Sequence, residues 1–180
     1  MDAGRPAETE FAPFYAGYVA RVSEDDILDV LTGQKAEIAA VAAAGRTKAD
    51  VRYEPGKWSV RELLSHIVDG ERVFGYRAFC ISRGEQAALP GFDEKDYVRT
   101  APLTDVTLDA LAAEFAVVRD AESSSSSRTS GASSSRLPTT LNRMLLSMSV
   151  PNSSFRYRLS SVMSVDTSAR GRFQFSTENA

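Results

Sequence analysis

Histidine, cysteine and tryptophan each occur once in the 180 residues of this chain, as His66, Cys80 and Trp58. A lone cysteine excludes an intramolecular disulfide and is typical of a reducing compartment, so we expect a cytoplasmic protein. No uninterrupted run of about eighteen apolar residues is present, so we expect no transmembrane helix and no membrane partner. The opening residues, MDAGRPAETE, are acidic and have no apolar segment, which argues against a secretory signal.

Lysine is missing from the last third of the chain, where the composition changes abruptly. Residues 123–180 contain seven arginines and two acidic residues, a net charge of +5, whereas residues 1–122 carry a net charge of −8. Serine occurs four times before residue 123 and eighteen times from there on. We therefore predict a mobile leader at 1–10, a helical domain at 11–122 and a Ser/Arg-rich tail of low order at 123–180. So few charges over such a tail are a weak phosphate-binding signal, so we expect no nucleic-acid partner.

The clearest structural signal is an amphipathic helix over residues 59–83. Ser59 is the expected N-cap, and Glu62 completes a capping box in which each side chain bonds the other residue's backbone amide. Apolar residues then recur at three- and four-residue spacing, which gives the helix one buried face. Gly84 stands where the glycine that ends a helix is expected.

Further helices are predicted on both sides of this one. A first long helix begins at Ser23 and ends at Gly45, and a short helical turn spans residues 93–100. Another long helix starts within residues 104–107 and ends near Glu122. Its predicted buried face consists of Leu108, Leu111, Phe115 and Val118, and Glu114 and Arg119 lie off that face.

The tail gives weaker signals. The five consecutive serines at 123–127 are expected to be flexible, because serine competes for backbone hydrogen bonds and is a poor residue for a helix interior. Residues 137–150 suit a short amphipathic helix. Residues 155–175 alternate loosely between apolar and polar, which suits a strand.

His66 is the candidate functional residue, and it is the only histidine of the chain. A helix places it about one turn from Glu62 and Asp69, near the edge of the apolar face. It would then serve as a metal ligand or as a general base oriented by a carboxylate. The alternative is a histidine that packs its ring at the edge of the core. No residue is assigned a catalytic role, and Cys80 is expected to be a small buried residue.

Four segments occur in an order and at a spacing that are specific: FAPFYAGYV, YEPGKWSVRELLSHIVDGERVFGYRA, LPGFDEKDYV and LAAEFAVVRDA. Together they cover roughly residues 11–122, and this part of the chain resembles the DinB-like (DinB/YfiT) superfamily of bacterial four-helix bundles. The resemblance implies an all-α fold, an up-and-down bundle of four helices.

The resemblance also implies a divalent metal, zinc or nickel, held between helices by three histidines. One of them stands at the position of His66, and the other two form a His-x-x-x-His pair on the last helix. Members related to thiol S-transferases use such a metal to activate a low-molecular-weight thiol. That pair is absent here, so His66 is the one metal ligand that the resemblance assigns. We therefore expect a chain that is metal-deficient and inactive as it stands.

The likeness ends where the composition changes, so we expect the last helix to be missing or replaced by an irregular Ser-rich tail. Leucine codons CTC become TCC, which encodes serine, when they are read one base out of phase. Our hypothesis is that residues 123–180 are translated in a shifted frame, and the alternative is a divergent natural tail. Translation of the DNA in the other two frames tests this, and it fails if neither frame contains a helical His-x-x-x-His.

Two functions remain open from the sequence. The first is a metal-dependent thiol S-transferase or hydrolase scaffold, with a low-molecular-weight thiol or another small molecule as its ligand. The second is a non-catalytic helical bundle that binds a ligand or a partner. A bundle without its last helix leaves apolar surface uncovered, so we also expect marginal stability or a homodimer.

Overall fold

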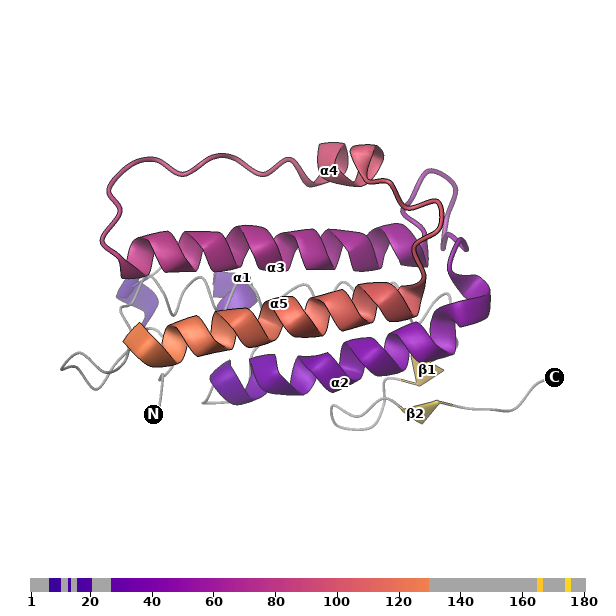
Figure 1. Cartoon of the computed structure of the whole chain (residues 1–180), viewed down its shortest axis with the longest axis horizontal. Helices are drawn as coiled ribbons and strands as arrows, with labels where there is room; N and C mark the ends of the chain where they lie inside the picture. The colour runs from indigo at the N-terminus through magenta and orange to yellow at the C-terminus, as the bar shows by residue number, and fades with distance from the viewer. Residues whose placement is uncertain are drawn as a thin grey trace.

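The structure is a computed structural model, and it describes residues 7–10, 13, 16–20, 27–129, 165–166 and 174–175. Its elements are η1 (Glu8–Glu10), α1 (Ala16–Val19), α2 (Ile27–Gly45), η3 (Arg46–Lys48), α3 (Val60–Ser82), α4 (Glu94–Thr100), α5 (Leu108–Thr129), β1 (Val165–Asp166) and β2 (Gln174–Phe175). The long helices lie side by side with α5 between α2 and α3, and the segment that carries α4 returns along the outer side of α3 (Figure 1). The predicted all-α, DinB-like fold is confirmed, with only the short antiparallel pair β1–β2 beside the helices in the described residues.

Helix α3 begins and ends as the sequence predicts. The Ser59 hydroxyl accepts a hydrogen bond from the Glu62 amide at 3.2 Å, and the Glu62 carboxylate accepts one from the Ser59 amide at 2.6 Å. Both halves of the capping box are therefore present. At the other end, Gly84 has a φ of 79°, a left-handed conformation that only glycine adopts without steric cost.

The predicted starts of α4 and α5 are also confirmed. Asp93 caps α4 by accepting hydrogen bonds from the amides of Lys95 and Asp96, at 3.0 and 3.2 Å. The Thr107 hydroxyl accepts a hydrogen bond from the Ala110 amide at 3.1 Å in the first turn of α5. Each helix therefore starts at a side chain that accepts hydrogen bonds from free amides of its first turn.

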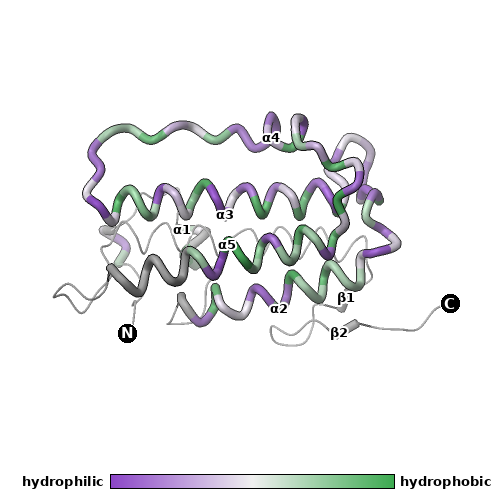
Figure 2. The backbone as a smooth tube through the Cα atoms, in the orientation of Figure 1, coloured by the Kyte–Doolittle hydropathy of each residue, from purple (hydrophilic) through white to green (hydrophobic). Residues whose placement is uncertain are grey.

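The hydrophobic core lies where α5 packs against α2 and α3. Its buried residues are Ile38, Val41 and Ala42 of α2, Val60, Leu64, Ile67 and Val68 of α3, and Leu108, Leu111 and Phe115 of α5. Figure 2 shows hydrophobic residues recurring along these helices with hydrophilic residues between them. Burying a side chain of this size contributes roughly 1.5–3 kcal/mol, so this cluster supplies much of the stability. Cys80 is buried and free, as expected.

The prediction for Arg119 is wrong, because this residue is buried, with only 1% of its surface exposed. Its Nη2 donates to Oε1 of Glu71 in α3 at 2.8 Å and to Oε1 of Gln34 in α2 at 2.9 Å. Its guanidinium carbon also lies 5.0 Å from the centre of the Phe115 ring. Because α5 packs against two helices, it buries more than its apolar stripe, and a charge there needs buried partners.

The prediction of a flexible segment from Ser123 is also wrong for its first part, because α5 continues through the serine run to Thr129. Extending a formed helix costs far less than nucleating one, and serine is only moderately unfavourable in a helix. The predicted helix at 137–150 and the predicted cap Ser23 lie outside the described residues, as does most of the tail. None of the helices in the described ranges has the length and hydrophobicity that a bilayer span requires.

Candidate functional site

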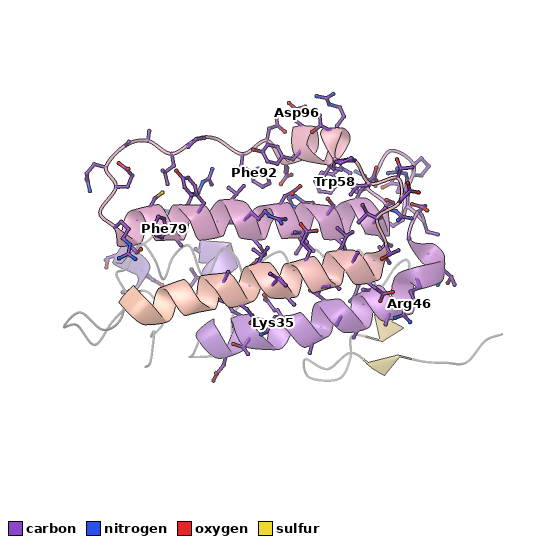
Figure 3. The ribbon with its side chains drawn as sticks, in the orientation of Figure 1. Lys35, Arg46, Trp58, Phe79, Phe92 and Asp96 are labelled. Atoms are coloured by element: carbon purple, nitrogen blue, oxygen red, sulfur yellow. The ribbon has the colours of Figure 1, made fainter. Side chains whose placement is uncertain are left out.

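His66 lies in an aromatic cluster between α3 and the segment that leads into α4. Its ring centre is 4.9 Å from that of Trp58, and the planes meet at 45°. On the other side the Phe92 ring stacks at 6.2 Å with planes 9° apart, and Phe92 meets Tyr97 edge-on at 4.9 Å. Figure 3 shows Trp58 and Phe92 on the side of α3 that faces α4. These contacts pack α4 against the first half of α3.

Glu94, the first residue of α4, is the carboxylate that approaches His66. Its Oε2 lies 3.8 Å from His66 Nε2, which is too long for a hydrogen bond. The Glu94 side chain is more than half exposed, so water screens its attraction for the histidine. Glu94 was not predicted from the sequence as a neighbour of His66. Only carboxylates of the same helix as His66 were considered, whereas Glu94 belongs to α4.

The metal that the family resemblance implies does not fit these residues. A catalytic zinc site uses three protein ligands, and a structural site uses four. In the part of the chain that the structure describes, no group of three His, Cys, Asp or Glu side chains is arranged to hold a metal ion. His66 is also the only histidine of the whole chain, so no second imidazole is available from it.

A cavity of about 450 Å³ lies beside the same stretch of α3, between α3, α4 and α5. It is lined by Ser65, Val68 and Asp69 of α3, by Tyr97, Thr100, Ala101, Pro102, Leu103 and Val106 of α4 and the connection that follows it, and by Leu111 and Glu114 of α5. This volume falls in the range of small-molecule sites, which combine apolar walls with a few polar groups. Tyr97 joins the cavity to the aromatic cluster, because it lines the cavity and also contacts Phe92.

Asp69 is the lining residue of the cavity whose pKa is shifted by its surroundings. Burial raises the pKa of its carboxyl above the ordinary value, and the nearby charges of Arg72 and His66 offset part of that effect. The second carboxylate of the cavity, Glu114, forms an ion pair with Arg72, whereas in the described residues no hydrogen bond or ion pair involves Asp69. A partly buried carboxylate of this kind is a feature of binding sites.

The wall opposite α3 is held in place by hydrogen bonds from α3 and within the wall itself. The Arg61 guanidinium donates to the backbone carbonyl of Val106 and also forms an ion pair with Asp50 at 3.0 Å. Within the wall, the Leu103 amide donates to Ala101 and the Val106 amide donates to Leu103, at 3.0 and 3.2 Å. These contacts tie the segment that follows α4 to the first turn of α3.

The three acidic residues of α3 have separate roles in the structure. Glu62 belongs to the capping box and accepts a hydrogen bond from Arg52 at 3.0 Å. Glu71 is buried in the core with Arg119. Asp69 lines the cavity, which His66 does not. The cavity was not predicted from the sequence, because its opposite wall is an irregular segment far from α3 in the sequence.

The comparison with protein families gives one match. The family model described as the DinB superfamily matches residues 19–135, which is more than half of the chain and includes α2 to α5. No curated protein and no solved structure matches the chain.

Proposed function

The chain belongs to the DinB superfamily, and on that premise we propose that it is a non-catalytic, small-molecule-binding bundle. The observation that carries the proposal is the cavity of about 450 Å³ between α3, α4 and α5. Its ligand is a small molecule, for which the family resemblance suggests a low-molecular-weight thiol. We further propose a cytoplasmic location, for which the single cysteine is the support.

The competing proposal is a metal-dependent thiol S-transferase or hydrolase, which the family resemblance implies. That chemistry needs a metal to lower the pKa of a bound thiol or water. His66 would be one ligand, but the described residues supply no three-ligand group around it. The aromatic cluster instead gives His66 a packing role beside Trp58 and Phe92. We therefore favour binding without metal-dependent turnover.

Metal titration separates these two proposals. The purified full chain is stripped with a chelator and titrated with Zn²⁺ and with Ni²⁺ by calorimetry, beside His66→Ala. We expect neither protein to bind one equivalent tightly, and no thiol transfer above the rate without protein. One equivalent of tightly bound metal that is lost in His66→Ala would refute the binding proposal.

A ligand screen tests the cavity itself. Ligand-observed NMR compares the wild-type chain with Ala101→Phe, which fills the cavity from its wall. Ala39→Phe is the matched control, because Ala39 is exposed on α2, which contributes no residue to the cavity. We expect the ligands of the wild-type chain, low-molecular-weight thiols included, to bind Ala39→Phe and not Ala101→Phe. Equal binding to all three proteins would place the ligand elsewhere.

A second candidate function, association with another protein, is favoured by one observation. Tyr76 and Phe79 are 57% and 48% exposed and lie three residues apart on α3, so they share a helix face. We propose a homodimer through this face. Light scattering of the wild-type chain against Phe79→Ser tests it: a dimer that becomes a monomer supports the proposal, and a wild-type monomer at all concentrations contradicts it.

A further inference from the structure

The charge of the cavity restricts what it can bind. Among its lining residues are two carboxylates, Asp69 and Glu114, and no lysine, arginine or histidine. Arg72, which lies outside the lining, already neutralises Glu114 through their ion pair. Asp69 therefore leaves one negative charge facing a partly enclosed space. A negative charge in such a place favours a cationic ligand and disfavours an anionic one.

The polar groups near Asp69 suit a compact cation. Ser65 lies one helical turn before Asp69 on the same face of α3, and Tyr97 and Thr100 of α4 line the cavity with it. The Thr100 hydroxyl donates its hydrogen to the backbone carbonyl of Asp96 at 2.8 Å, so its oxygen can only accept from a ligand. A primary ammonium has three donors and no acceptor, which matches a cavity whose lining offers a carboxylate and hydroxyl oxygens.

The rest of the lining is apolar, and it indicates what the uncharged part of the ligand should be. It consists of Val68, Ala101, Pro102, Leu103, Val106 and Leu111. These residues offer no charge and, apart from backbone atoms, no hydrogen-bonding group, so they favour a hydrocarbon body.

We propose that the cavity binds a primary alkylammonium compound, with its ammonium on Asp69 and its hydrocarbon part against the apolar wall. This inference rests on the proposed function and names the chemical class of its ligand. It disfavours a thiolate, whose negative charge would face Asp69, and leaves a thiol that also carries an ammonium group as an acceptable ligand.

Three probes of the same shape test the charge. Calorimetry measures the binding of cyclohexylmethylamine, cyclohexylmethanol and cyclohexanecarboxylate to the wild-type chain and to Asp69→Asn, which keeps the side-chain shape and removes the charge. We expect the amine to bind the wild-type chain best and to lose roughly ten- to a hundredfold in affinity in Asp69→Asn, as for a hydrogen bond to a charged group. The alcohol should bind both proteins equally, which also shows that the variant is folded.

The outcomes separate the ligand class from the function. If the alcohol binds the wild-type chain as tightly as the amine does, and Asp69→Asn binds the amine equally, the ammonium assignment is overturned and the cavity remains a binding site. If no probe binds any better to the wild-type chain than to Ala101→Phe, both the assignment and the proposed function fail. A loss of amine binding in Asp69→Asn with unchanged alcohol binding supports the assignment.

Discussion

Replacing Arg119 by methionine tests how the polar contact in the core joins the three long helices. The Arg119–Glu71 ion pair has an N–O distance of 2.8 Å, and both side chains are only 2% exposed. Methionine keeps much of the length of arginine and removes its charge, so the Glu71 carboxylate stays buried without the guanidinium. Because a buried charge without its counter-ion is strongly disfavoured, we expect the free energy of unfolding to fall by about 3–5 kcal/mol.

Such a loss is large on the scale of the whole protein. Domains have unfolding free energies of about 5–15 kcal/mol, and for a chain of this length each kcal/mol shifts the midpoint of thermal unfolding by roughly 2–4 °C. The expected midpoint for Arg119→Met is therefore roughly 6–20 °C below that of the wild-type chain. Urea unfolding followed by circular dichroism measures the free energy, and a thermal scan measures the midpoint.

The double variant Glu71→Leu/Arg119→Met separates a buried charge from a lost contact. Removing both charges leaves apolar side chains in the core, so the double variant should be more stable than Arg119→Met and close to the wild-type chain. Arg72→Met is the matched control, since Arg72 pairs with Glu114 between the same two helices but is about half exposed. It should lose at most about 1 kcal/mol. Equal losses for Arg72→Met and Arg119→Met, or a double variant that loses the sum of the single losses, would refute the reasoning.

Three further predictions concern α3 and its cavity. Ser59→Ala removes the hydroxyl half of the capping box and should lower the free energy of unfolding by about 1 kcal/mol in urea unfolding, and no loss would contradict the cap. Gly84→Ala places a side chain at a φ of 79° and should lower the free energy of unfolding. Gly70→Ala lies within α3 with no neighbouring side chain within 4 Å of the added methyl, so it should raise the free energy of unfolding by roughly 0.5–1 kcal/mol. Equal effects of the two variants would contradict this. Asp69→Asn should be more stable than the wild-type chain at pH 7, because the raised pKa of Asp69 means that the fold disfavours its charged form. In urea unfolding at several pH values, this difference in stability should shrink as the pH falls through the raised pKa towards the ordinary 3.8. A difference in stability that does not depend on pH would contradict the prediction.

The helix boundaries could be predicted because each depends on neighbouring residues. Ser59 with Glu62, Asp93 and Gly84 are local signals, since a cap needs only a side chain or a backbone conformation within three or four residues. The end of α5 was missed because serine propensity is a weak influence beside the low cost of extending a helix.

Burial in the core could not be predicted from one helix at a time. The periodicity of α5 places Arg119 off the apolar stripe, which is correct for a helix with one neighbour. In the structure α5 packs against both α2 and α3, so Gln34 and Glu71 reach Arg119 from two sides. No pattern within α5 contains that information. For the same reason the sequence marked Asp69 only as a neighbour of His66 and did not predict the cavity, whose opposite wall comes mostly from residues 100–106.

The residues that hold the fold and the residues that form the candidate site are largely separate. The core cluster, the Arg119 ion pair and the capping box at Ser59 involve neither His66 nor Asp69. The contacts of His66 with Trp58, Phe92 and Glu94 join α3 to the α4 segment, which also carries one wall of the cavity. A bundle built in this way keeps its three long helices when a metal ligand is lost. The cavity, which His66 does not line, then remains available as a binding surface.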